Sequence, residues 1–196
     1  QTCTALSRML VPEALYSQAV DIAKNVAESL TVGDPMSANS DMGPMCSKSQ
    51  RDTVLRYINL GIEEGASLVT GGLISSEDCQ GGYYVHPTIF ADVNNSMTIA
   101  KDEIFGPVLC MIPYSSIAEA IEIANDSEFG LSAAVWAKDQ STAMSIANKI
   151  DAGQVFVNGG EFNYSAPFGG YKKSGNGREW GEHGLTEFVE TKAIMQ

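Results

Sequence analysis

Histidine and cysteine are scarce in this chain of 196 residues, which holds two histidines and four cysteines. The cysteines are widely spaced and form no Cys-x-x-Cys pair; they are Cys3, Cys46, Cys79 and Cys110. This spacing argues against a zinc site and gives no disulfide framework, so we predict no bound metal and reduced thiols. Reduced thiols are typical of a cytoplasmic protein, which is the compartment we expect.

Long apolar runs and positive charge are lacking as well. No stretch approaches the roughly 20 apolar residues that a membrane helix needs. The chain carries 12 basic and 24 acidic residues, which gives a net charge of −12. An acidic surface repels the phosphate backbone of a nucleic acid. We therefore expect no nucleic acid as a partner and, in the absence of a long apolar run, no membrane.

What the chain does have is regular apolar spacing, in runs of helical period separated by short runs of strand type. Ser47 with Gln50 and Ser116 with Glu119 have the spacing of a capping box, and Asp139 suits a helix N-cap. The expected helices are 13–30, 47–64, 116–125 and 139–150, and the expected strands are 67–72, 87–93, 106–114, 131–137, 153–158 and 186–194.

Strands and helices alternate in the second half of the chain, which favours parallel strands joined by helical crossovers. We therefore predict an α/β fold of one main domain, with a mostly parallel sheet and helices on both faces. Ligands of such sheets bind at the carboxyl ends of the strands. The loops after 110–114, 135–137 and 157–158 are the expected place of a site.

Two short stretches leave a functional and a structural reading open. Cys3, in "QTCTALSR", is either a nucleophile or a small apolar core residue, and its local sequence favours the second. In "DEIFGPV" (102–108), Glu103 and Phe105 either face a ligand or belong to a solvated turn. Taken alone, this stretch also favours the structural reading.

A glycine-rich segment covers residues 163–184, "NYSAPFGGYKKSGNGREWGEHG". Its spacing is G-x-G-x-x-x-G, and no strand directly precedes it, so it is not a dinucleotide-binding fingerprint. We expect these glycines to allow tight turns and close packing of the backbone.

Three motifs in a fixed order give a more specific interpretation. They are "QTCTALSR" (1–8), "EIFGPV" (103–108) and "FVN" followed by "PFGGYKKSGNGREWG" (156–181). Together they resemble the C-terminal, catalytic half of the aldehyde dehydrogenase family, and the resemblance runs over nearly the whole chain. It implies an NAD- or NADP-dependent enzyme that oxidises a small-molecule aldehyde to a carboxylic acid, as a homo-oligomer.

The resemblance implies a role for Cys3 as the catalytic nucleophile, with Thr2 and Thr4 flanking it at the substrate pocket. The Cys3 thiolate would attack the aldehyde to give a thiohemiacetal, and hydride loss would leave a thioester that water hydrolyses. Its backbone N–H would contribute to an oxyanion hole.

The resemblance also implies roles for five residues around the thiol. Glu103 would hold the hydroxyls of the nicotinamide ribose, and Phe105 would pack beside the nicotinamide. Phe168 would line the aldehyde pocket, and Phe162 and Tyr164 would help to shape it.

Several parts of such an enzyme are not found in these residues. We expect 1–185 to form the catalytic domain and 186–196 the strand that joins an oligomerisation region, with the cofactor-binding domain absent. The general-base glutamate and the asparagine of the oxyanion hole are expected upstream of this chain. As an alternative, the chain alone would be a folded but catalytically incompetent module.

Overall fold

A computed structural model describes residues 1–73 and 81–196 of the chain. Cys79 lies outside the described residues, as does part of the segment 72–86, which the sequence predicts to be a loop. The chain divides into two compact units, Gln1–Ala120 and Ile121–Gln196. The domain expected over 1–185 is therefore described unit by unit.

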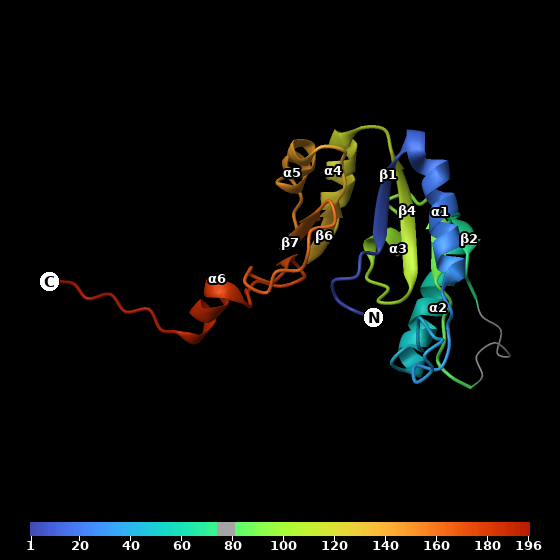
Figure 1. The fold of residues 1–196 in the computed structure, drawn as a ribbon, viewed down its shortest axis with the longest axis horizontal. Coiled ribbons are helices and arrows are strands. Elements are labelled where there is room, and N and C mark those ends of the chain that lie inside the picture. Colours follow the sequence, from blue (N-terminus) through green and yellow to red (C-terminus); the bar gives the residue numbers. More distant parts are fainter. Residues whose placement is uncertain (74–80) are drawn as a thin grey trace. The chain divides into compact units, whose positions relative to one another are not determined.

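Unit 1 contains a four-stranded sheet with the strand order β1-β4-β3-β2. The interior strand β4 is parallel to both of its neighbours, β1, which lies beside it in Figure 1, and β3. The edge strand β2 is antiparallel to β3. The α/β class and the mostly parallel sheet are thus confirmed. The strands are β1 (Arg8–Pro12), β2 (Ser67–Thr70), β3 (Thr88–Ala91) and β4 (Val108–Tyr114).

Helices cover both faces of this sheet. Successive side chains of a strand point to opposite faces, so the neighbouring residues Ile89 and Phe90 pack against different helices. On one face Ile89 joins a core with Met111 and with Ala27 of α1 (Tyr16–Ser29), which follows the short 3-10 helix η1 (Glu13–Leu15). On the other face Phe90 packs against α2 (Lys48–Glu63) and α3 (Thr98–Lys101). A Cβ added to Gly61 of α2 would lie 3.0 Å from the Phe90 ring and 2.9 Å from Ile99 of α3.

Unit 2 is built around a β-α-β element. β6 (Ser132–Val135) and β7 (Gln154–Val157) pair in parallel, and α5 (Gln140–Ala147) connects them. A second, antiparallel pair joins β5 (Phe129–Gly130) to β8 (Tyr171–Lys172). The remaining elements are α4 (Ile117–Asn125), which begins in unit 1, α6 (Gly181–Leu185) and the 3-10 helix η2 (Thr186–Phe188).

The expected helix caps are present. The hydroxyls of Ser47 and Ser116 accept hydrogen bonds from the backbone N–H groups of Gln50 and Glu119, respectively, at 3.2 Å. Asp139 accepts from the N–H of Thr142 at 2.8 Å. Hydrogen bonds from Ser141 and Thr142 lower the pKa of the Asp139 carboxyl, as expected for a carboxylate that caps a helix.

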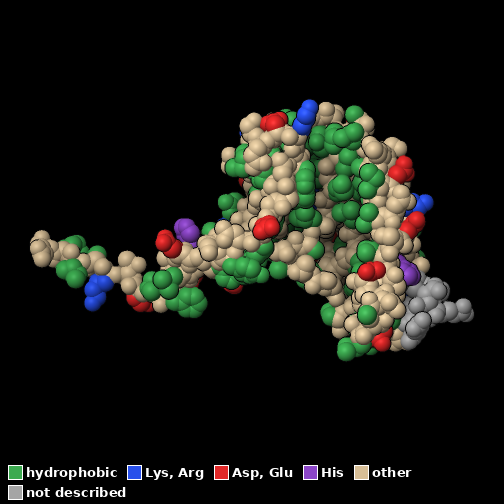
Figure 2. All heavy atoms as spheres, viewed as in Figure 1, with side chains coloured by type: hydrophobic (Ala, Val, Ile, Leu, Met, Phe, Trp, Pro, Cys, Tyr) green, Lys and Arg blue, Asp and Glu red, His purple; other side chains and the backbone are tan. Residues whose placement is uncertain are grey.

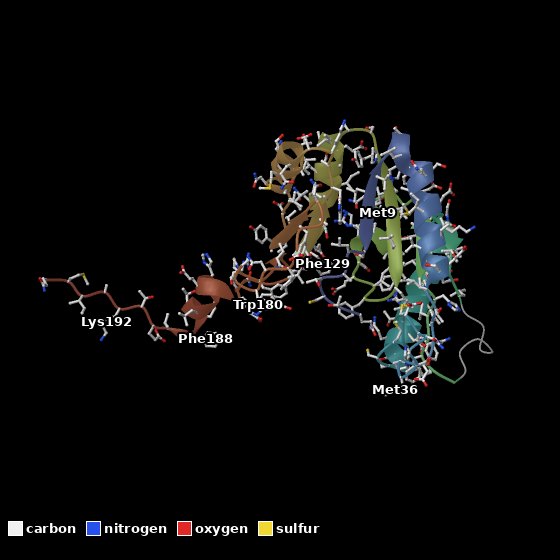
Figure 3. The ribbon with its side chains drawn as sticks, in the orientation of Figure 1. Met9, Met36, Phe129, Trp180, Phe188 and Lys192 are labelled. Carbon is white, nitrogen blue, oxygen red and sulfur yellow. The ribbon has the colours of Figure 1, made fainter. Side chains whose placement is uncertain are left out.

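The strand expected at 186–194 does not form. These residues contain η2 and then no regular structure, and Figure 3 shows Phe188 and Lys192 on this extended segment. Its apolar side chains, drawn green in Figure 2, are open to solvent: Phe188 is 86% exposed and Ile194 is 82% exposed. An alternating pattern forms a strand only when another strand supplies the backbone partners, and none pairs with this segment among the described residues.

One thiol is deeply buried in unit 1, which predicts a pH-dependent stability. Cys110 of β4 is 1% exposed, and its thiol donates to the carbonyl of Ile99 at 3.4 Å. Burial raises the pKa of this thiol from 9.0 to about 12, and the charge of Arg8 opposes the rise only in part. Between these values the unfolded chain loses the proton while the folded chain keeps it, so stability falls as the pH rises above 9.

We expect this single thiol to lower the free energy of unfolding by about 2 kcal/mol between neutral pH and roughly pH 10.5. Denaturant unfolding at both pH values measures the loss in the wild-type protein and in Cys110→Ala, whose loss should be smaller by that amount. Cys46→Ala is the matched control, because Cys46 is exposed. Equal losses in all three proteins would contradict the prediction.

Candidate active site

A cavity of about 310 Å³ opens in unit 1 at the amino ends of β1 and β4. Three segments line it: the residues before β1, the residues before β4 and the residues that lead into α2. The lining residues are Gln1–Cys3, Ala5–Ser7, Met42–Met45 and Glu103–Val108. The carboxyl end of β4, where we expected a site, contributes no residue to it.

The physical reason why this cavity lies elsewhere is local. The carboxyl-end rule describes the crevice that crossover loops leave beside an open parallel sheet. In unit 1 the segments entering the strands enclose space instead, because Ile104 is buried beneath the turn before β4 and the Met42–Met45 segment lies beside it around the same cavity. The position of a concave site depends on which side chains enclose the space as well as on the topology of the strands.

Cys3 is exposed and lines the cavity, so the reading as a core residue was wrong. It lies in a turn in which the N–H of Ala5 donates to the carbonyl of Thr2 at 3.1 Å. The segment then joins the sheet through the Ser7 carbonyl, which accepts from the N–H of Cys110 at 2.9 Å. Thr2 lines the cavity, whereas the half-buried Thr4 does not.

Glu103 and Phe105 lie just before the bend at Gly106 and Pro107 where the chain turns into β4, and both line the same cavity. Phe105 has a φ of +55°, a left-handed conformation that is uncommon for an aromatic residue. The intervening Ile104 is 4% exposed, whereas Phe105 is 40% exposed. Ile104 is thus buried between two exposed residues that line the cavity, an arrangement that the local sequence of "DEIFGPV" alone did not favour.

Two glutamine amides hold this turn. The side chain of Gln50 donates to the carbonyl of Ile104 at 3.0 Å and to that of Phe105 at 3.3 Å. The side chain of Gln1 donates to the same Phe105 carbonyl at 3.0 Å. Sequence reasoning assigned no site role to either glutamine, because a lone amide has no signature until its partners are known.

In unit 2, the three expected pocket aromatics gather around one tryptophan. Trp180, labelled in Figure 3, lies with its ring centroid 4.8 Å from that of Phe168 and 5.3 Å from those of Phe162 and Tyr164. Phe162 and Tyr164 also meet at 4.9 Å. We did not single out Trp180, although its place within the third motif was a usable signal. This cluster belongs to a different unit from the cavity around Cys3.

Two features are not found in the described parts of the chain. Residues 1–73 and 81–196 contain no group of three or more metal-ligating side chains. Within the same ranges, no helix has the length and apolar content to cross a membrane.

Comparison with known proteins gives a consistent result over the whole chain. The sequence model described as "Aldehyde dehydrogenase family" matches residues 1–194. A curated relative, 3-succinoylsemialdehyde-pyridine dehydrogenase of a Pseudomonas species, is 46% identical over 195 residues. That match covers 100% of this chain and 41% of the relative, so the chain spans about two fifths of that protein's length.

Solved structures agree with this match. Aldehyde dehydrogenase C of Pseudomonas syringae, a cysteine-to-alanine mutant in complex with NAD+ and octanal, superimposes with a TM-score of 0.96 and 47% identity. The match covers 99% of this chain and 40% of that one. An NAD+ complex of an aldehyde dehydrogenase from Bacillus cereus gives a TM-score of 0.93 and 43% identity, over 99% and 39% of the two chains. The expected placement in the C-terminal half of the relatives is not confirmed by these matches.

Proposed function

The chain belongs to the aldehyde dehydrogenase family, and on that premise we propose that the whole protein oxidises an aldehyde to a carboxylic acid with NAD or NADP. The observation that carries the proposal is the single cavity lined by Cys3, Glu103 and Phe105. In the proposed reaction Cys3 supplies the nucleophile, and Glu103 and Phe105 would contact the cofactor beside it. The proposal assigns the nucleophile to Cys3.

Cys3 acts through its sulfur atom. The thiolate adds to the aldehyde carbon and forms the carbon–sulfur bond of a thiohemiacetal, while the carbonyl oxygen takes the negative charge. The backbone N–H of Cys3 donates a hydrogen bond to that oxygen. Loss of hydride from the same carbon leaves a thioester on Cys3, and water then cleaves it to release the acid and the thiol.

Glu103 and Phe105 suit a nicotinamide cofactor. The Glu103 carboxylate is exposed on the cavity wall and can accept hydrogen bonds from two ribose hydroxyls. The exposed Phe105 ring offers an apolar face for the nicotinamide. When bound, the nicotinamide accepts the hydride.

Phe168, Phe162 and Tyr164 form the proposed wall for the apolar part of the aldehyde. The proposal rests on their packing around Trp180, which makes one aromatic surface of separate side chains. Aromatic surface favours an apolar substituent through area removed from water. Octanal, bound to the Pseudomonas syringae relative, has such a substituent.

A turnover assay of the whole protein, with Glu103→Gln as the variant, tests this function. We expect reduced cofactor and carboxylic acid to form in equal amounts. Glu103→Gln should raise KM for NAD by about tenfold, because an amide keeps one acceptor and loses the charge-assisted hydrogen bonds to the ribose. Glu161→Gln is the matched control, since Glu161 is exposed and belongs to unit 2.

Hydrolysis of esters without any oxidation of aldehydes would contradict the proposed function. An unchanged KM in Glu103→Gln would contradict the role of that residue alone. We propose in addition that the 196 residues by themselves do not oxidise aldehydes. Glu103 is the one carboxylate among the described lining residues, and its proposed role at the ribose leaves no carboxylate there to act as the general base. Turnover by the isolated chain, shown to be folded by circular dichroism, would contradict that statement.

A further inference from the structure

Three segments of unit 1 meet at the side-chain amide of Gln1. Its nitrogen donates to the carbonyl of Phe105 at 3.0 Å. Its oxygen accepts from the backbone N–H of Cys46 at 2.9 Å. Gln1 itself lies two residues before Cys3, on the segment that carries the thiol. One planar amide therefore joins the thiol segment, the segment leading into α2 and the turn before β4.

The turn that Gln1 contacts needs such support. Phe105 is left-handed at φ +55°, and a non-glycine residue keeps that conformation only when its surroundings hold it. Its side chain is 40% exposed and so only partly packed, and the hydrogen bonds to its carbonyl add to what holds this conformation. Gln1 and Gln50 supply both donors on this carbonyl, and they approach it from different segments of the chain.

We infer that Gln1 is a positioning residue for the proposed dehydrogenase reaction. Its amide holds the Glu103–Phe105 segment in place relative to the Cys3 segment. The Glu103 carboxylate, which would bind the ribose, then keeps a fixed position relative to the thiol. Gln1 touches neither cofactor nor substrate in this role. The inference rests on the proposed function, because register matters only if both sides of the cavity act on one reaction.

Two substitutions separate the two hydrogen bonds. Gln1→Leu removes both of them and adds no charge. Gln1→Glu keeps the acceptor for Cys46 but removes the donor for Phe105 while the carboxyl is ionised. Gln18→Glu is the matched control, because Gln18 is an exposed glutamine of α1 and does not line the cavity.

The experiment measures the Kd for NAD of the whole protein by quenching of tryptophan fluorescence, and kcat at saturating NAD and aldehyde. We expect Gln1→Leu to raise the Kd by about three- to tenfold, with kcat within about twofold of wild type. This is the range for one net hydrogen bond, because of the two bonds lost only the one to Phe105 holds the segment that carries Glu103. If Gln1 only stabilised the fold, Gln1→Leu would lower the melting temperature but would not raise the Kd for NAD while kcat stays constant.

Lowering the pH distinguishes the hydrogen bond from simple charge repulsion. At pH 8, Gln1→Glu should bind NAD as weakly as Gln1→Leu. Toward pH 5 a fraction of its carboxyl groups protonates and can donate to Phe105 again, so its Kd should fall part of the way toward the wild-type value at that pH. Gln1→Leu should not recover, and Gln18→Glu should follow wild type throughout.

Wild-type affinity for NAD in Gln1→Leu would overturn the inference, as would a pH-dependent loss confined to Gln1→Glu, which would indicate charge repulsion alone. These results differ from a failure of the proposed function. In that case the wild-type protein itself would not reduce NAD, whereas a failure of this inference leaves wild-type turnover intact.

Discussion

Replacing Cys3 by serine in the whole protein should lower kcat/KM for aldehyde oxidation by at least about a thousandfold, which is the scale of removing a covalent nucleophile. A serine hydroxyl at neutral pH is a far weaker nucleophile than a thiol, and an alkoxide leaves a tetrahedral carbon less readily than a thiolate. The change is nearly isosteric and affects an exposed side chain. The melting temperature should therefore stay close to that of the wild-type protein.

Cys46→Ser is the control for this prediction. Cys46 is the other exposed thiol described in unit 1, and it follows the lining segment Met42–Met45 without lining the cavity itself. It should keep most of the wild-type kcat/KM. A Cys3→Ser protein that retains a tenth or more of the activity would contradict the assignment of the nucleophile, as would a larger loss in Cys46→Ser.

Of all substitutions of a glycine by alanine in unit 2, Gly153→Ala should cause the largest loss of stability. Gly153 lies directly before β7, and a Cβ there would be 1.6 Å from the carbonyl oxygen of Gly169. Backbone atoms cannot yield as a flexible side chain does. We expect a destabilisation of about 3 kcal/mol, at the upper end of the usual range for overpacking.

The same substitution should weaken aldehyde binding, because Gly169 follows Phe168 directly in the loop that would be displaced. Thermal unfolding and KM for an apolar aldehyde measure the two effects. Gly160→Ala is the control, since its Cβ would meet the Val157 carbonyl at 3.4 Å, an ordinary contact. Equal stability of the two variants would show that the close approach at Gly153 is not required.

Close backbone packing was the expected purpose of the glycine-rich segment, and the structure confirms it at three positions. Cβ atoms on Gly169 and Gly170 would lie 2.3 Å from the Gly177 carbonyl and 2.4 Å from Ser174, respectively. A Cβ on Gly181, at φ +59°, would lie 2.5 Å from the carbonyl of Ser165. Composition predicted these contacts because only glycine permits them.

Elements fixed by local chemistry could be predicted from the sequence. α2 begins after its Ser47 cap, and Gly65, which follows the C-cap residue Glu64, has a φ of +91°, as a left-handed stop requires. The run expected at 106–114 forms β4, because seven consecutive residues of it pair or pack within the sheet. Apolar period and capping residues are both local properties.

Features that depend on partners could not be predicted in this way. The 186–194 segment has a strand pattern but finds no strand to pair with in the described chain. The cavity around Cys3 lies at the amino ends of the strands, because buried Ile104 and the left-handed Phe105 shape the turn there. The role of the Gln1 amide depends on two backbone groups 45 and 104 residues away along the chain.

The candidate site shows the same division. The order of three motifs was enough to assign the family and to single out Cys3, Glu103 and Phe105, which the structure brings to one cavity. Thr4 was expected beside the thiol at this pocket, but the turn after Thr2 directs the chain so that Thr4 does not line it. Neighbours in sequence share a cavity only if the backbone between them allows it.

The most direct test of the central claim is mass spectrometry of the tryptic peptide that contains Cys3 and ends at Arg8. The whole protein is mixed with an aldehyde and NAD, quenched with acid during turnover, and digested. We expect the acyl group of the aldehyde on Cys3 as a thioester, present only when NAD is included. Turnover with no acyl group on this peptide, or with the acyl group on Cys46, would contradict the assignment of Cys3 as the nucleophile.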